Sequence, residues 1–267
     1  MRPWFVALSA LLTAPALAQD LVVDGAQTFQ TIDGFGTNIN ALSFNTANSQ
    51  AAIDLLADQM GQTLWRVVFD MMDWEDPSDN ADPMVMDQAY YAALYGNAKF
   101  QNLWGTLRYL NQKGFDRTVV LSFMGRLATW MGGASLARAD EEEVVEAIVS
   151  LIVWARNHEQ VRFGILDPFN ESDWNGNEGP QLSATQYARL LGRLVARLDA
   201  EGITDLRFIG PNTASLNNGV FTWMPAMMSD ATLMARVDHF GFHDYSNNAS
   251  SVAAAITGSA YPRRTSG

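Results

Sequence analysis

Glu171 is the residue of this sequence best placed for acid–base chemistry, because it stands two positions after a mostly apolar segment, residues 165–169. A carboxyl group at the end of a buried strand is partly desolvated, which favours the protonated form that a general acid needs. The neighbouring Asn170 carries an amide that can hold a substrate hydroxyl. An exposed Asn-Glu pair in a loop is the alternative, and these two residues alone leave it open.

Other polar and aromatic side chains stand at or just beyond the ends of apolar segments and could join Glu171. They are Asn38, Arg66, Trp130, Trp174, His243 and Tyr245. Aromatic rings offer flat apolar faces on which sugar rings stack, while polar groups bind their hydroxyls. Each aromatic residue taken singly is more often part of a core, and His243 could equally be a buried histidine with satisfied hydrogen bonds.

No cofactor and no metal site are expected. The sequence has no cysteine, and two of its histidines, His239 and His243, are four residues apart on a predicted strand instead of a helix. Residues 34–36 lack the spacing of a dinucleotide fingerprint, and no Gly-x-Ser-x-Gly elbow is present. The sequence therefore predicts chemistry carried by side chains alone.

The chain is acidic, with 17 Lys and Arg against 29 Asp and Glu, a formal net charge of −12. This balance disfavours nucleic acid or an anionic membrane surface as a partner. It suits an enzyme acting on neutral polymers, although a solvated acidic surface without functional meaning explains it equally well.

The first 18 residues have the pattern of a secretory signal peptide. Arg2 precedes an apolar run over residues 5–12, and Ala16-Leu17-Ala18 is a small-x-small cleavage site before Gln19. The apolar run is shorter than the roughly 20 residues that span a membrane. We expect a secreted or periplasmic protein whose core holds together without disulfides.

The elements that must position these residues follow from an alternation of apolar and helical patterns, which is typical of a parallel sheet with crossover helices. Six strands are predicted over residues 31–36, 64–70, 118–123, 162–169, 206–210 and 237–243. A further strand is expected over residues 21–30, and helices over residues 49–60, 87–113, 144–154, 183–202, 218–234 and 249–256. Residues 19–267 are expected to form one domain, an α/β barrel with about six of the eight strand–helix units of the (β/α)8 TIM-barrel type.

Two of the predicted helices begin with recognisable capping sequences. Ser183-Ala184-Thr185-Gln186 matches a capping box, in which Ser183 accepts from the backbone of Gln186 and the Gln186 side chain reaches back. In Asp140-Glu141-Glu142-Glu143, Asp140 is expected to cap and Glu143 to reach back. The acidic run is therefore interpreted as structural.

Five segments in this order resemble the clan A glycoside hydrolases, most nearly family 30, with family 5 relatives close behind. They are residues 29–36 (FQTIDGFG), 64–67 (LWRV), 121–131 (ending in TWM), 168–171 (PFNE) and 237–245 (VDHFGFHDY). The resemblance implies a TIM barrel that hydrolyses a β-glycan with retention of configuration. It implies that Glu171 is the acid/base and that Arg66 lies close to the nucleophile. It also implies that Trp130, His243 and Tyr245 border the site.

The sequence departs from this family in one respect. The clan's nucleophile is a glutamate at the end of the seventh strand, and this chain has no glutamate after Glu201. We therefore expect an incomplete copy of a secreted retaining β-glycanase, inactive by itself and a monomer if complete. The alternative is a non-catalytic carbohydrate-binding barrel. Glu178 is expected in a solvated loop, with a substrate contact as the alternative, and xylan, β-galactan and β-glucan all stay open as ligands.

Overall fold

The computed structural model describes residues 24–27, 32–41, 46–72, 74–243, 245 and 249–262. The contacts divide the chain into two units, Met1–Asp33 and Gly34–Gly267. In the first unit, residues 24–27 form a turn in which the Gln27 N–H donates to the Asp24 carbonyl at 3.2 Å. The predicted signal peptide, residues 1–18, lies outside the described residues, as does the predicted strand over 21–30 apart from this turn.

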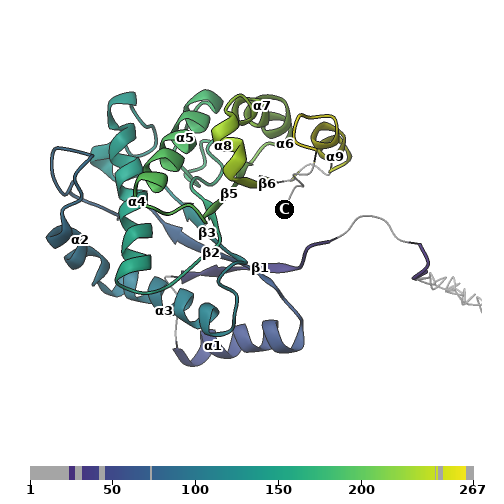
Figure 1. Ribbon diagram of the computed structural model, residues 1–267, viewed down its shortest axis with the longest axis horizontal. Helices are drawn as coiled ribbons and strands as arrows, with labels where there is room; N and C mark the ends of the chain where they lie inside the picture. The colour runs from purple at the N-terminus through teal and green to yellow at the C-terminus, as the bar shows by residue number, and fades with distance from the viewer. Residues whose placement is uncertain are drawn as a thin grey trace, which may run out of the picture. The chain divides into compact units, whose positions relative to one another are not determined.

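The second unit contains a six-stranded sheet in which every neighbouring pair is parallel and the strands follow one another in sequence order (Figure 1). The strands are β1 (Gly36–Asn40), β2 (Leu64–Asp70), β3 (Val119–Met124), β4 (Ile165–Asp167), β5 (Arg207–Thr213) and β6 (Val237–Phe242). This order, with helices between the strands, confirms the predicted α/β class and a partial barrel of six strand–helix units.

The helices between the strands include four long ones that follow one another around the outside of the sheet (Figure 1). These are α1 (Thr46–Asp54), α3 (Ala98–Gln112), α4 (Glu141–Asn157) and α5 (Ala184–Ala200). The shorter ones are η2 (Leu55–Gln59), α2 (Gln88–Tyr95), η3 (Thr129–Met131), η4 (Arg138–Asp140), α6 (Leu216–Asn218), η5 (Gly219–Trp223), α7 (Met224–Met228), α8 (Ala231–Arg236) and α9 (Ala249–Thr257). No helix in the described ranges is long and apolar enough to cross a membrane.

The core lies between the sheet and these helices, and β2 shows how. Trp65, Val67 and Phe69 are fully buried and alternate with residues that are partly exposed, among them Arg66. The Phe69 ring packs against Phe100 of α3 with 4.8 Å between ring centroids. Because side chains alternate along a strand, the face of β2 away from the helices is left free to carry polar groups.

The first strand was predicted wrongly. Residues 32–35 are not a strand, and β1 begins where the predicted strand ended, at Gly36. Exposure alternates along β1: Thr37 and Ile39 are half-buried, whereas Asn38 and Asn40 are exposed. A strand with a polar inner face lacks the continuous apolar run used to locate the others.

Two helix predictions also need correction. The helix expected over 87–113 is interrupted at Gly96, and Asn97 caps the second part by accepting from Phe100 N at 3.1 Å. The segment 218–234 contains four short helices, with Asp230 capping the last of them. Asparagine and aspartate side chains can accept from backbone N–H groups in place of helical carbonyls. Asn97 therefore separates α2 from α3, and Asp230 separates α7 from α8.

The two predicted caps have different outcomes. Ser183 accepts from Gln186 N at 3.2 Å as expected, but the Gln186 side chain donates to Leu136 O and Glu141 instead of reaching back. Asp140 makes no side-chain cap bond. Glu141 is buried, and its Oε2 accepts a hydrogen bond from Arg189 Nε of α5 at 2.9 Å. Part of the acidic run therefore joins α4 to α5.

Candidate active site

A buried polar network connects the middle strands of the sheet. The β3–β4 register places Ser122 beside Asp167, and the Ser122 hydroxyl donates to Asp167 Oδ2 at 2.6 Å. Arg66 of β2 donates from Nη2 to the same Oδ2 at 3.2 Å and to Ser122 Oγ at 2.8 Å. Burial raises the pKa of the Asp167 carboxyl, while the charge of Arg66 and these hydrogen bonds act against that shift.

Asn170 is locked into this network immediately after β4. Its Oδ1 accepts from Arg66 Nη2 at 2.8 Å and from Asn212 Nδ2 at 3.2 Å. Asn212 also donates to Asp167 Oδ2. Since Oδ1 receives both donors, the amide has a single orientation. Its Nδ2 points the other way and reaches the carbonyl of Glu178 at 3.4 Å.

Glu171 follows Asn170 and is 3% exposed. Its φ of +43° lies in the left-handed region, which is uncommon outside glycine, and its N–H donates to the Asn212 carbonyl at 2.9 Å. Asn212 itself has a φ of +52°, at a register irregularity of β5. Two irregular backbone positions on neighbouring strands thus turn the Glu171 side chain away from the sheet ladder.

The Glu171 carboxylate is held by two side chains from the end of β6. Tyr245 donates from its hydroxyl to Oε1 at 2.7 Å, and His243 Nδ1 also contacts Oε1. The hydrogen bond to the Glu171 carboxylate, together with burial and its negative charge, raises the pKa of Tyr245 to about 12. Tyr245 is therefore a fixed hydrogen-bond donor at neutral pH.

The loop after Glu171 carries two further groups of the site, and two glycines shape it. A Cβ at Gly176 would lie 2.2 Å from the ring of Trp174, so the ring rests against this backbone. A Cβ at Gly179 would lie 1.8 Å from the Asn170 carbonyl oxygen. Only glycine allows such a close approach, which brings Glu178 back to β4.

Two cavities meet at Glu171. The first has a volume of about 510 Å³ and is lined by Asn38, Arg66, Met124, Asn170, Glu171, Trp174, Glu178, His243 and Tyr245. The second, of about 580 Å³, shares Glu171, Trp174 and Tyr245 with the first and adds Asp173, Ala214, Ser215 and Asn218. The carboxylate is therefore accessible from both cavities although it is almost fully buried.

The structure brings together seven of the eight residues predicted for the site and leaves out Trp130. Trp130 lines neither cavity. Its indole N–H donates to the Glu75 carbonyl at 2.6 Å, and its ring packs against the core. Trp130 is drawn to a backbone acceptor in the β2–α2 connection, a contact that strand-end reasoning does not anticipate.

Sequence reasoning missed other members of the site. Ser122 lies inside β3, and Asp167 lies inside the predicted strand over residues 162–169 although β4 ends at this residue. Asn212 of β5 is a further member that the sequence analysis did not select. A lone aspartate in an apolar strand was the available signal, because buried carboxylates are almost always paired. Glu178 is half-buried and lines the first cavity, so the expected solvated loop is wrong for this side chain.

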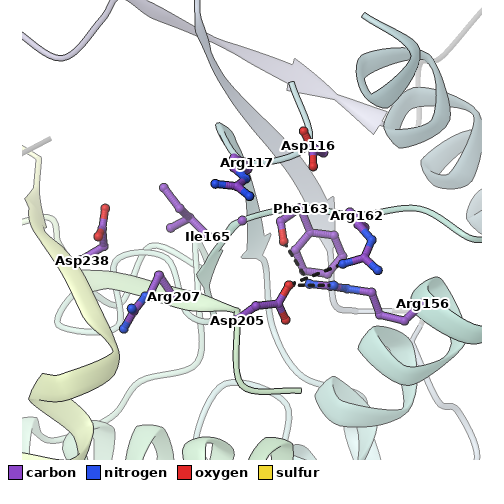
Figure 2. Close-up of a pocket in the computed structure, with 10 residues that line it drawn as sticks. Asp116, Arg117, Arg156, Arg162, Phe163, Ile165, Asp205, Arg207 and Asp238 are labelled. Carbon is purple, nitrogen blue, oxygen red and sulfur yellow. Dashed lines mark hydrogen bonds and ion pairs between the residues drawn. The ribbon is translucent and has the colours of Figure 1, made fainter. Parts of the chain in front are cut away.

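A separate cavity of about 450 Å³ lies at the opposite edge of the sheet, where the strands begin (Figure 2). Three of its charged groups pair with one another: Arg156 Nη1 lies 3.0 Å and Arg162 Nη1 3.6 Å from Asp205 Oδ2. In barrels of this type, residues at the amino ends of the strands serve stability, whereas chemistry gathers at the carboxyl ends. The cavities at Glu171 are therefore the better candidates.

The sequence and the structure were each compared with known proteins. The sequence matches no protein-family model and no curated protein. The glycoside hydrolase family 30 subfamily 8 xylanase Xyn30A of Clostridium acetobutylicum matches with a TM-score of 0.60 and 17% identity, over 84% of this chain and 52% of that one. The endo-β-1,6-glucanase BT3312 matches with a TM-score of 0.64 and 15% identity, over 91% and 58%.

A family 39 β-xylosidase of Caulobacter crescentus also matches, with a TM-score of 0.52 and 19% identity, over 86% of this chain and 51% of that one. This chain has the fold of these glycoside hydrolases. It spans between about half and 58% of the length of the three structures. The predicted resemblance to family 30 is thus confirmed at the level of the fold.

Proposed function

We propose that the cavities around Glu171 bind a neutral β-linked polysaccharide at the acid/base half of a retaining glycoside hydrolase site. The observation that carries this proposal is the buried carboxyl group of Glu171, which is held through Oε1 by Tyr245 and His243 where two cavities meet. The fold adds support, since the chemistry of such barrels lies at the carboxyl ends of the strands.

Glu171 would act as the general acid in the first step. Because Oε1 accepts from Tyr245, the transferable proton belongs on Oε2. That proton passes to the glycosidic oxygen as the bond from this oxygen to the anomeric carbon breaks. The carboxylate left on Glu171 then accepts a proton from the water that hydrolyses the glycosyl intermediate, and the acid is restored.

The neighbouring groups would position the sugar. Trp174 is 47% exposed at the border of both cavities and offers its ring for stacking. Arg66 and Asn212 fix the amide of Asn170, so that Nδ2 can donate to a sugar hydroxyl. Such a hydrogen bond, fixed in advance, strengthens as charge develops in the transition state.

A second carboxylate must attack the anomeric carbon from the side opposite the leaving group. Glu178 and Asp173 are the other carboxylates among the described residues that line these cavities, and both belong to the same loop as Glu171. Asp173 is also occupied, because it accepts from Ala214 N, Ser215 N and Asn218 Nδ2. We therefore propose that this chain binds the glycan without turning it over.

The first experiment measures binding of xylo-oligosaccharides and β-1,6-gluco-oligosaccharides by calorimetry. Trp174→Ala should weaken binding at least about 10-fold, the value of one aromatic stacking contact of roughly 1.5 kcal/mol. Phe221→Ala is the matched control, because Phe221 is 68% exposed and lines neither cavity. Absence of binding to every β-glycan tested would refute the proposal.

The second experiment separates a hydrolase half-site from a non-catalytic carbohydrate-binding protein. The alternative draws support from the described residues of the two cavities, whose other carboxylates lie in the same loop as Glu171. Formate or azide can enter in place of a second carboxylate and attack the anomeric carbon of an aryl β-glycoside, from which the aryl alcohol departs. Slow turnover in formate, lowered about 10²-fold or more by Glu171→Gln for a poor leaving group, supports the acid role. Binding with no turnover under any condition supports the alternative.

A further inference from the structure

Three carboxylates from separate elements meet away from the Glu171 cavities. Glu75 and Asp79 belong to the connection between β2 and α2, and Glu146 lies in the second turn of α4. Each residue places one carboxylate oxygen within 4.8 Å of the oxygens of the other two. Glu75 and Glu146 are 0% exposed. The cluster is thus a buried concentration of negative charge.

Three of the four oxygens of the two buried glutamates lack the donors that buried carboxylates normally have. Glu75 Oε1 accepts from the Tyr91 hydroxyl at 3.0 Å, but Glu75 Oε2 has no hydrogen-bond partner among the described residues. Neither oxygen of Glu146 has one within the described ranges. Buried polar groups are satisfied in the great majority of cases, so a fully buried carboxylate aimed at two others calls for a ligand.

The surrounding structure holds the three groups in place. Trp130 donates to the carbonyl of Glu75, whose φ is +54°. The Asp79 carboxylate accepts from Asn80 N at 2.7 Å and from Asp87 N at 2.7 Å, which folds the loop around it. Glu146 is fixed by the helix that carries it. The oxygens therefore converge as a result of built structure and not of flexible surface side chains.

Arg197 of α5 is the positive group that acts on Glu146 through its charge, and its hydrogen bonds go to other acceptors, among them the carbonyls of Pro83 and Met84. Glu143, one turn before Glu146 in α4, adds a further negative charge. Coulomb repulsion between carboxylates this close requires protons or a cation to relieve it.

We propose that Glu75, Asp79 and Glu146 form a calcium site that fastens the β2–α2 connection to α4. The ligands are all oxygens, which hard cations prefer, and no nitrogen or sulfur ligand stands among them. Ca²⁺ holds its ligands at about 2.3–2.6 Å, so oxygens up to about 5.2 Å apart can share one ion. Mg²⁺ usually takes one or two carboxylates and keeps several waters, so three convergent carboxylates, two of them fully buried, favour Ca²⁺.

The site is independent of the proposed glycan site, because none of its three ligands lines the cavities at Glu171. Its expected effect is on stability. Calcium at about 100 times its dissociation constant should raise the melting temperature by about 5–10 °C. Calorimetric titration of EDTA-treated full-length protein should show one ion per chain, with Mg²⁺ at least about 10-fold weaker.

Terbium luminescence gives a local readout. The Trp130 indole donates to the Glu75 carbonyl, so excitation of tryptophan should sensitise Tb³⁺ bound here, and Ca²⁺ should displace it. Glu146→Gln and Asp79→Asn should each weaken Tb³⁺ and Ca²⁺ binding at least about 10-fold, since each removes one of three charged ligands. Asp79 is a half-buried loop residue, so Asp79→Asn should leave the protein folded. This variant still tests the site if Glu146→Gln disturbs α4.

Glu142→Gln is the matched control. Glu142 lies in the first turn of the same helix, is 39% exposed and pairs with Arg193 at 2.9 Å. Its loss should leave ion affinity within about twofold of wild type. The proposal is overturned if wild-type protein neither binds Tb³⁺ with sensitised emission nor melts higher in Ca²⁺, or if Glu142→Gln weakens binding as much as Glu146→Gln does.

Discussion

The region of Glu171 and the cluster of Glu75, Asp79 and Glu146 both contain buried carboxylates, yet these groups differ in how many hydrogen-bond donors they receive. Glu171 Oε1 is contacted by Tyr245 and His243, and Asp167 Oδ2 accepts from Arg66, Ser122 and Asn212. Glu146, in contrast, has two buried oxygens without a donor in the described chain.

The difference teaches what each region can do. A carboxylate surrounded by donors is fixed in one orientation, which is what a group that transfers a proton at a defined atom needs. Carboxylates that face one another without donors are high in energy alone and become favourable when a cation arrives. The two proposals therefore assign a neutral ligand to the first region and a cation to the second.

The largest expected effect tests this contrast through stability. Asp167→Ala should lower the free energy of unfolding by about 3 kcal/mol, because Arg66, Ser122 and Asn212 lose their shared acceptor. Glu146→Leu should raise it by about 1–2 kcal/mol in EDTA, since an unsatisfied buried carboxyl group is replaced by an apolar one. Urea unfolding measures both, and the comparison fails if the two changes have the same sign.

The next effect concerns pH. Burial, with repulsion from Asp79 and Glu143, raises the pKa of Glu75 and of Glu146 to about 8, while Tyr91 opposes the shift at Glu75 and Arg197 at Glu146. The folded state then holds protons that the unfolded state releases above about pH 4.5. In EDTA, the contribution of these two groups to stability should be greatest below that pH and fall as pH rises to about 8, by up to about 1.4 kcal/mol per pH unit and group.

Calcium provides the control for this prediction. With the ion bound, the carboxylates are ionised without mutual repulsion, so the fall between about pH 5 and 8 should be smaller. Urea unfolding at several pH values, in EDTA and in calcium chloride, measures the difference. Stability that rises across this window in EDTA would contradict the unsatisfied state of the cluster.

The sequence predicted the Glu171 region well because parallel strands align their carboxyl ends. Asn170, Glu171 and His243 follow apolar strands, so their convergence requires only the fold. Trp130 also follows a strand, β3, but it does not line the cavities at Glu171. Its indole N–H donates to a backbone carbonyl, that of Glu75, instead. A position at a strand end predicts that side chains lie close together, but it does not predict which group each side chain hydrogen-bonds to.

The acidic cluster could not be predicted in this way. Glu75 and Asp79 lie in an irregular connection, and Glu146 lies on a helix far along the chain, so no spacing rule joins them. The acidic run at residues 140–143 was interpreted as a helix start. That interpretation does not extend to Glu146, which lies on the buried face of α4. A glutamate among the apolar residues of α4, between Val145 and Ala147, was the available signal.

A smaller effect is expected from the loop that closes the first cavity. Gly179→Ala would place a methyl group 1.8 Å from the Asn170 carbonyl, and a backbone atom cannot move aside cheaply. The free energy of unfolding should fall by about 1–3 kcal/mol, and oligosaccharide binding should weaken because Asn170 and Glu178 shift. Gly258→Ala is the control, since the nearest atom is 3.3 Å away. Equal losses in the two variants would remove the role given to this close approach.

The smallest effect separates the two regions through their tyrosines. The pKa of Tyr245 is raised to about 12 chiefly by its hydrogen bond to Glu171, whereas that of Tyr90 is raised to about 12 chiefly by burial and then by Glu75 and Asp79. In Glu171→Gln the neutral amide no longer opposes the phenolate, so the pKa of Tyr245 should fall toward 10 while that of Tyr90 stays unchanged. NMR titration of ¹³C-labelled tyrosine follows both groups in one sample. Parallel movement of the two would mean that the regions are electrostatically coupled, whereas a change at Tyr245 alone shows that the Glu171 carboxylate acts only within its own cavities.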